Sequence, residues 1–167
     1  GRMARLDGKT AIVTGGASGF GAGIVRKFIT EGARVMIADI NGDGAAALAK
    51  ELGALSQQVD VSKDASVNEM AGTAIARFGR LDILVNNAGV SHMPAPLDEI
   101  SEADFDRVVA INIKSVYLTA RHLVPHMKAN RRGVILNIAS TAAVSPRPRL
   151  SWYNASKGWM VTATKSM

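Results

Sequence analysis

The residues best suited to chemistry lie near the end of the sequence. Tyr153 and Lys157 are four positions apart in YNASKGWMVTATKSM, and Ser140 precedes Tyr153 by 13. On a helix, residues i and i+4 share one face about 6 Å apart. A free tyrosine has a pKa of about 10 and is a poor base at neutral pH, but a neighbouring ammonium favours the phenolate. The pair predicts a general acid/base; the alternative is an exposed tyrosine beside a surface lysine.

A glycine-rich stretch, TGGASGFG (Thr14–Gly21), follows the first apolar run. Its spacing, Gly15-x-x-x-Gly19-x-Gly21, differs from the common G-x-G-x-x-G fingerprint. It is not a P-loop either, because Ala and Gly stand where Lys and Ser or Thr are required. Glycines at a helix N-terminus let a phosphate approach backbone N–H groups. The stretch therefore indicates a phosphate-binding turn, with a simple tight turn as the alternative.

A carboxylate, Asp39, ends the second apolar run, 18 residues after Gly21. A carboxylate at this place can accept hydrogen bonds from the ribose hydroxyls of an adenosine, and it would repel a 2′-phosphate. Neither Ser18 nor Ile40 supplies the positive charge that a 2′-phosphate requires. The residues thus favour NAD over NADP. The alternative is a turn or capping aspartate ahead of an Asn-Gly pair.

Polar or small residues also follow the remaining apolar runs. Asp60 and Val61 end the third run, NNAG (Asn86–Gly89) ends the fourth, and Ser140 ends the fifth. Asparagine offers both donors and acceptors, and the small Ala and Gly after it let a flat cofactor lie against the backbone. An asparagine-rich turn is the alternative for NNAG alone.

Five short apolar runs alternate with helical patterns, and these elements must position the residues above. The expected strands are 10–15, 33–40, 56–61, 81–87 and 133–140. The expected helices are 21–32, 44–53, 66–79, 101–130 and a last one beginning near 153. Apolar strands separated by helices indicate a parallel sheet covered on both faces. Right-handed crossovers give a doubly wound α/β fold with its ligand at the carboxyl ends of the strands.

Composition narrows the class of protein. The 167 residues suit one domain, and the absence of cysteine excludes disulfides and thiolate chemistry and fits the cytoplasm. The net charge of +6 is scattered rather than clustered, so we expect no nucleic-acid partner. We expect no membrane span and no secretory signal. His122 and His126 lack the glutamate of H-E-x-x-H, so we expect no metal.

Taken in order, these motifs resemble the short-chain dehydrogenase/reductase family, in the bacterial branch of 3-oxoacyl-carrier-protein reductases and glucose dehydrogenases. Each motif is modest alone, but the ordered set is specific and extends from about Leu6 to Met167. The matching positions are Thr14-Gly15-x-x-x-Gly19-x-Gly21, Asp39, Asp60, Asn86-Asn87-Ala88-Gly89, Asn112, Ser140 and Tyr153-x-x-x-Lys157.

The resemblance implies a role for each position. Tyr153 would be the general acid/base for a secondary alcohol or ketone, and Lys157 would lower its pKa and hold the nicotinamide ribose. Ser140 would hydrogen-bond the substrate oxygen, and Asn112 would anchor a water that links Lys157 to solvent. The alternative for Asn112 is a polar helix face. The implied cofactor is NAD rather than NADP, bound by Gly15, Ser18, Gly19, Phe20, Gly21, Asp39, Ile40, Asp60, Val61, Asn87, Ala88, Gly89, Tyr153 and Lys157.

The resemblance also implies a Rossmann-type sheet with strand order 3-2-1-4-5, from which strands six and seven of the family are missing. We therefore expect residues 1–167 to be a single NAD(P)-binding domain that is incomplete at its C-terminus, with Gly1 and Arg2 left by cloning. The fifth strand would then be an exposed apolar edge. In the full-length protein we expect a cytoplasmic homodimer or homotetramer.

Other functions remain open at this point. One is an NADP(H)-dependent 3-oxoacyl thioester reductase on the same fold. A second is a non-catalytic nucleotide-binding regulator, which would tolerate loss of the catalytic residues. A third is a methyltransferase, which also uses a glycine-rich first turn and an acid after the second strand but does not require NNAG with Tyr153 and Lys157.

Overall fold

A parallel sheet forms the centre of the molecule. The computed structural model describes residues 4–90 and 95–138. The strands run in the order β3-β2-β1-β4-β5, and all neighbours are parallel. This confirms the α/β fold and the predicted strand order. The strands are β1 (Thr10–Thr14), β2 (Arg34–Asp39), β3 (Leu55–Gln58), β4 (Ile83–Asn86) and β5 (Val134–Asn137).

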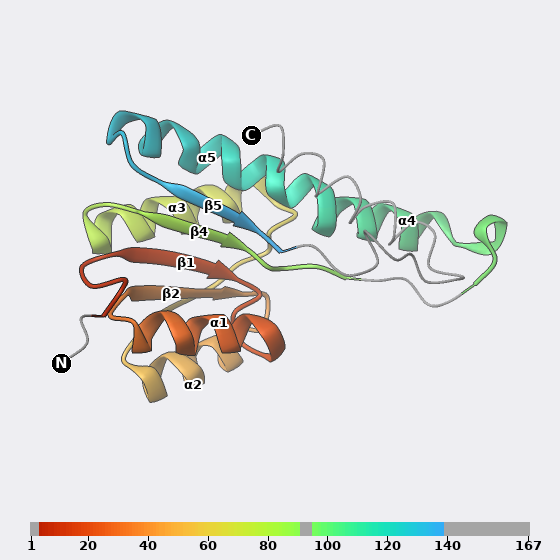
Figure 1. Cartoon of the computed structure of the whole chain (residues 1–167). Helices are drawn as coiled ribbons and strands as arrows, with labels where there is room; N and C mark the ends of the chain where they lie inside the picture. The colour runs from red at the N-terminus through yellow and green to blue at the C-terminus, as the bar shows by residue number, and fades with distance from the viewer. Residues whose placement is uncertain (1–3, 91–94, 139–167) are drawn as a thin grey trace.

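Helices cover both faces of the sheet (Figure 1). On one face lie α1 (Gly19–Thr30) and α2 (Gly42–Leu52), and on the other lie α3 (Asp64–Phe78) and α5 (Ser115–Ala129). The helix α4 (Glu102–Val109), preceded by a short 3₁₀ turn (Leu97–Glu99), extends beyond the carboxyl ends of the strands. No helix among the described residues is long and apolar enough to span a bilayer.

The two faces of the sheet explain the apolar strands. In β1, Ala11 and Val13 pack toward α1 and α2, whereas Ile12 packs toward α3 and α5. A central parallel strand is therefore buried on both sides and apolar throughout. The strand β3, with sequence LSQQ, alternates between half-buried and exposed residues because it lies at one edge.

The strand β5 forms the other edge of the described sheet. Its apolar residues Val134 and Leu136 are 54% and 42% exposed. Their sheet neighbours Ile83 and Val85 are buried and belong to the core under α1 and α2. The described residues thus contain the exposed apolar edge that the sequence predicts.

The predicted long helix is interrupted by a π-helical turn. Ser101 caps its start as expected, since its Oγ accepts a hydrogen bond from the Asp104 N–H at 3.1 Å. However, α4 and α5 are separated by a π turn at Ala110–Lys114. Such turns occur frequently at functional sites. This one contains Asn112.

The region between β3 and α3 differs from the predicted boundaries. The strand ends at Gln58 rather than at Val61, and α3 begins at Asp64 rather than at Ser66. Between them the Asp60 carboxylate accepts from the Ser62 N–H, and the Asp60 carbonyl accepts from the Lys63 N–H. Side-chain oxygens that bind nearby backbone donors compete with strand and helix, which explains the turn.

Candidate functional site

A cavity of about 470 Å³ lies at the carboxyl ends of the strands. It is the place where a doubly wound fold binds its ligand. Nine predicted cofactor-binding residues line it, namely Gly15, Ser18, Asp39, Ile40, Asp60, Val61, Asn87, Ala88 and Gly89. The remaining wall is formed by Ala38, Val59, Ser62, Val90 and Ile111.

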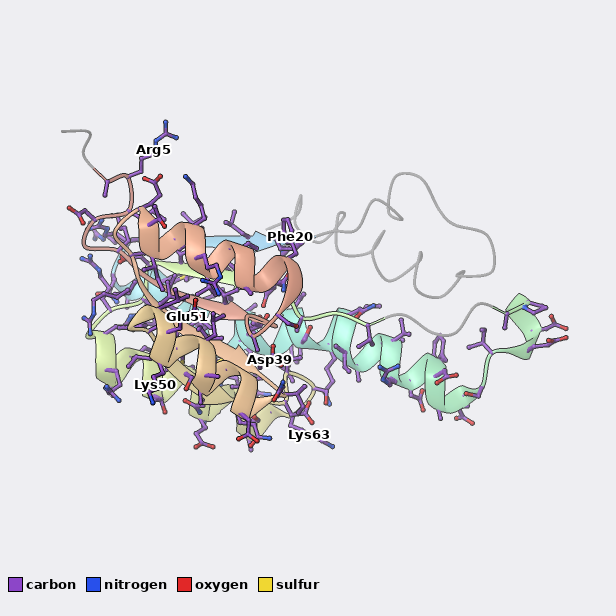
Figure 2. The ribbon with its side chains drawn as sticks, turned by 90° about the horizontal axis from the view of Figure 1, so that it is seen from below. Arg5, Phe20, Asp39, Lys50, Glu51 and Lys63 are labelled. Carbon is purple, nitrogen blue, oxygen red and sulfur yellow. The ribbon has the colours of Figure 1, made fainter. Side chains whose placement is uncertain are left out.

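The first residues of α1 do not line this cavity. Gly19 and Phe20 border a shallow groove along α1 instead of the cavity, and Phe20 is 69% exposed. Figure 2 shows Phe20 at the same end of the domain as Asp39 and Lys63. The structure therefore places Gly19 and Phe20 beside the cavity rather than on its wall, and their part in cofactor binding stays a prediction.

Close packing explains the glycines of the turn. Gly15 and Gly19 have φ angles of +62° and +57°, which L side chains rarely adopt. A Cβ on Gly21 would lie 2.1 Å from the Gly15 carbonyl oxygen and 2.5 Å from Nδ2 of Asn87. The first turn of α1 carries no acidic residue. A backbone this tightly folded, with the positive end of a helix dipole beside it, fits a pyrophosphate.

Thr14 and Asn87 join the turn after β1 to the loop after β4. The Thr14 hydroxyl donates to the Val85 carbonyl at 3.3 Å and accepts from the N–H groups of Asn87 and Ala88 at 3.0 and 3.2 Å. The Asn87 side chain donates to the Gly15 carbonyl at 3.1 Å. These bonds hold two cavity walls, far apart in sequence, in one arrangement.

Asp39 is anchored by two backbone donors. Its Oδ2 accepts from the Ala17 N–H at 3.0 Å, and its Oδ1 accepts from the Asn41 N–H at 2.9 Å. The second bond is the turn interaction that the sequence offered as an alternative, but Asp39 also lines the cavity. Each carboxylate oxygen has two lone pairs, so the anchored group retains acceptor capacity for a ligand.

Asp60 is held by serines on both sides of its turn. Its Oδ1 accepts from the Ser62 hydroxyl at 2.5 Å and from the Ser62 N–H at 3.0 Å. Its own N–H donates to Ser66 Oγ at 2.9 Å. The hydrogen bond from the Ser62 hydroxyl is the main reason that the pKa of Asp60 lies below its ordinary value. Asp60 is therefore a fixed, ionised acceptor on the cavity wall.

The two asparagines of NNAG have different roles, because Asn86 belongs to the sheet and Asn87 to the cavity wall. Asn86 is buried, donates to Asn137 Oδ1 at 2.8 Å and accepts from the Thr119 hydroxyl at 3.0 Å. These bonds connect β4, β5 and α5. Asn86 therefore stabilises the sheet, whereas Asn87 forms the site.

Asn112 is fully buried in the π turn. Its Oδ1 accepts from the Val90 N–H and its Nδ2 donates to the Val90 carbonyl, both at 2.7 Å. This excludes the alternative of an asparagine on a polar helix face. The amide instead fixes the end of the NNAG loop to the helix, and Val90 lines the cavity.

The predicted catalytic residues Ser140, Tyr153 and Lys157 lie outside the described residues. The two histidines of α5 have partners of other kinds: His122 Nε2 lies 2.8 Å from Asp64 Oδ1, and His126 Nε2 accepts from the Leu81 N–H at 3.3 Å. Residues 4–90 and 95–138 contain no group of three or more residues suited to hold a metal ion.

Ser62 and Val90 line the cavity but were not among the predicted site residues, and Thr14 entered only as part of the glycine-rich motif. An Asp side chain commonly accepts from the backbone N–H two residues on, so the contact of Asp60 with the Ser62 N–H had a local signature. Val90 had none, because its partner Asn112 is 22 residues away.

Comparison with known proteins places these features in context. The chain matches the short chain dehydrogenase family over residues 9–167. It is 46% identical over 167 residues to 4-formylbenzenesulfonate dehydrogenase of Comamonas testosteroni, covering 97% of this chain and 66% of that protein. It is 42% identical over 166 residues to D-threitol dehydrogenase of Mycolicibacterium smegmatis, covering 96% and 64%.

A solved structure agrees with the fold. The crystal structure of 3-ketoacyl-(acyl-carrier-protein) reductase from Brucella melitensis complexed with NADH superposes with a TM-score of 0.94 at 47% sequence identity. The match covers 96% of this chain and 69% of that chain. The chain thus spans 64–66% of the length of the two dehydrogenases above.

Proposed function

Because the chain belongs to the short-chain dehydrogenase family, we propose that it is the cofactor-binding part of an NAD-dependent oxidoreductase that interconverts a secondary alcohol and a ketone. The observation that carries the proposal is the cavity at which Gly15, Asp39, Asp60 and Asn87 meet. These residues come from the ends of four strands, which is the arrangement a dinucleotide requires at a switch point.

In this proposal each part of a dinucleotide lies against a different wall of the cavity, in the order of the strands. The pyrophosphate would lie on the glycine turn between β1 and α1. The adenosine ribose would bind Asp39 at the end of β2, so the adenine would lie toward β3, beside Asp60 and Val61. The nicotinamide would lie on the opposite side, along Asn87, Ala88 and Gly89 after β4.

The preference for NAD over NADP depends on Asp39. Its carboxylate is fixed by two backbone N–H groups and cannot easily turn away. A 2′-phosphate would bring a second negative group to this point. Binding titrations of the protein with NADH and NADPH test the preference, and tighter binding of NADPH would contradict it.

When bound, the nicotinamide supplies hydride transfer. In the oxidative direction, Tyr153 as phenolate would take the hydroxyl proton of the alcohol, and oxidised nicotinamide would be the acceptor of the hydride from the carbinol carbon, so that a ketone and the reduced cofactor result. Lys157 favours the phenolate, and Ser140 donates a hydrogen bond to the substrate oxygen. Asn112 holds the NNAG loop through Val90; its role in a water chain to Lys157 remains a prediction of the sequence.

The enzyme assignment is tested by Tyr153→Phe. We expect turnover to fall by about a hundredfold or more, since general acid/base catalysis contributes roughly 10²–10⁴-fold. NADH affinity should fall much less, because the substitution removes only the hydroxyl of one of the proposed cofactor-binding residues. Unchanged turnover in Tyr153→Phe would refute Tyr153 as the general acid/base, whereas NADH binding without any turnover by the unaltered protein would support a non-catalytic regulator. Binding of S-adenosylmethionine instead of NADH would support a methyltransferase.

The substrate remains to be found. The relatives are named for a sulfonated aromatic aldehyde, a polyol and an acyl-carrier-protein thioester. An NADP(H)-dependent 3-oxoacyl thioester reductase is therefore the second candidate; the structural likeness favours its substrate class, although the neighbouring structure is complexed with NADH. A screen of alcohols, sugars and hydroxyacyl thioesters with NAD and NADP separates the two. The homo-oligomer and the cytoplasmic location expected from the sequence are further proposals, which gel filtration and cell fractionation test.

A further inference from the structure

The turn between β3 and α3 fixes a carboxylate at one end of the cavity. Both serine donors to the Asp60 side chain, the Ser62 hydroxyl and the Ser62 N–H, converge on Oδ1. Oδ2 thereby keeps its acceptor capacity, while rotation of the carboxylate would break both bonds. Asp60 and Ser62 both line the cavity.

The backbone of Asp60 is engaged as well. Its N–H donates to Ser66 Oγ, and its carbonyl accepts from the Lys63 N–H at 3.1 Å. A ligand at this end would therefore meet Asp60 through its side chain. An ionised carboxylate is an acceptor only, so the group that it selects must be a hydrogen-bond donor.

We propose that Ser62 is the positioning residue that makes the base end of the cavity selective for the exocyclic amino group of adenine. The inference rests on the proposed function, which places the adenine beside β3. Adenine presents an amino group, a hydrogen-bond donor, at position 6. Hypoxanthine presents a carbonyl oxygen there, and this oxygen and the Asp60 carboxylate are both acceptors, so they would repel each other instead of forming a hydrogen bond. Ser62 acts through Asp60, because it holds the carboxylate in the orientation that distinguishes the two bases.

The test compares binding of NADH with binding of reduced nicotinamide hypoxanthine dinucleotide, measured by calorimetry. A hydrogen bond to a charged group contributes about 1.5–3 kcal/mol, so we expect the unaltered protein to prefer NADH by about tenfold to a hundredfold. In Ser62→Ala the preference should fall to about threefold or less. Ser62→Thr, which keeps the hydroxyl, should restore it. The matched control is Ser56→Ala, an exposed serine on β3 away from the cavity.

Each outcome has a meaning. If the unaltered protein binds both dinucleotides equally, or if Ser62→Ala keeps the full preference, the role of Ser62 is wrong while the proposed function stands. If the unaltered protein binds neither, the proposed function fails and this inference with it. Thermal melting checks that each variant is folded; if Ser62→Ala is not, Ser62→Cys takes its place, because a thiol is only a weak donor.

Discussion

The two ends of the sheet use carboxylates in opposite ways. At the amino ends of the strands, Asp82 is 4% exposed and lies between β1 and β4. It accepts from the Thr10 N–H at 3.0 Å, and Arg80 Nε lies 2.9 Å from its other oxygen. Its charge is thus neutralised within the protein, and its bonds hold neighbouring strands together.

At the carboxyl ends, Asp39 and Asp60 are anchored by neutral donors, and the charges of Lys63 and Lys114 contribute less to the lowered pKa of Asp60 than its hydrogen bonds with Ser62 do. Their donors are backbone N–H groups and a serine hydroxyl. Within the described residues, neither carboxylate forms an ion pair with a Lys or Arg side chain. The difference teaches that a neutral donor fixes the position of a carboxylate but leaves its charge available to a ligand.

The largest effect should come from Asp82, where charge and structure coincide. Asp82→Ala leaves the buried Thr10 N–H without its carboxylate acceptor, and a hydrogen bond to a charged group contributes about 1.5–3 kcal/mol to the free energy of unfolding. Urea unfolding measures this loss, and NADH affinity of the folded protein should stay within about twofold. The control is Asp43→Ala on the exposed surface of α2, which should change stability by less than about 0.5 kcal/mol. A loss below about 1 kcal/mol for Asp82→Ala would remove the contrast between the two ends.

The glycine turn should respond next, and mainly through binding. Gly21→Ala forces its methyl group against the Gly15 carbonyl and the Asn87 amide. We expect a loss of about 1–3 kcal/mol in stability from overpacking and at least a tenfold loss of NADH affinity. Gly23→Ala, two residues on, meets no atom within 4 Å and should stabilise the helix by about 0.5–1 kcal/mol. Equal affinities of the two variants would contradict the close-packed turn.

Asp39→Asn should change cofactor choice more than stability. The asparagine keeps an acceptor for one backbone donor but removes the charge, so repulsion of a 2′-phosphate falls. At about 5 Å in water this repulsion amounts to roughly 1–2 kcal/mol, and we expect the ratio of NADH to NADPH affinity to fall about tenfold. Asp43→Asn changes the net charge equally and should leave the ratio alone. The same ratio in both variants would refute the assignment of Asp39.

The smallest effect concerns Asp64, an exposed carboxylate with a titratable partner. The hydrogen bond from His122 is the first reason that the pKa of Asp64 lies below its ordinary value. A lowered pKa stabilises the fold above the unfolded value of about 3.9. That contribution is lost as the pH falls through the folded pKa. His122→Ala should therefore flatten the acid limb of the stability curve, measured by urea unfolding between pH 6 and 3.

Arg121→Ala is the matched comparison for this prediction. Arg121 lies 3.8 Å from the same oxygen of Asp64, against 2.8 Å for His122. Its removal should therefore flatten the acid limb less. An acid limb as steep in His122→Ala as in the unaltered protein would show that the pair does not influence stability.

Local patterns predicted the elements and much of the cavity wall. Uninterrupted apolar runs indicated buried parallel strands, and residues that follow the first four runs proved to line the cavity, as Asp39, Asp60 and Asn87 do. The ends of strands and helices were predicted less well where a side chain, instead of another backbone group, binds a backbone N–H or carbonyl. The strand β3 ends three residues early because Asp60 takes part in a turn, and the π turn at Ala110–Lys114 had no visible periodic signal.

The sequence by itself determined the class of fold, the strand order through family resemblance, and which residue types reach the carboxyl end of the sheet. Those properties follow from apolar periodicity and from the position of glycines and acids in the chain. Only the tertiary structure decided how these residues are held. Thr14 bonds to Asn87, Asn112 to Val90, and Asp39 to Ala17 across separations that no local pattern encodes. The physical reason is that buried backbone donors must find acceptors, and the folded chain decides which acceptor lies within reach.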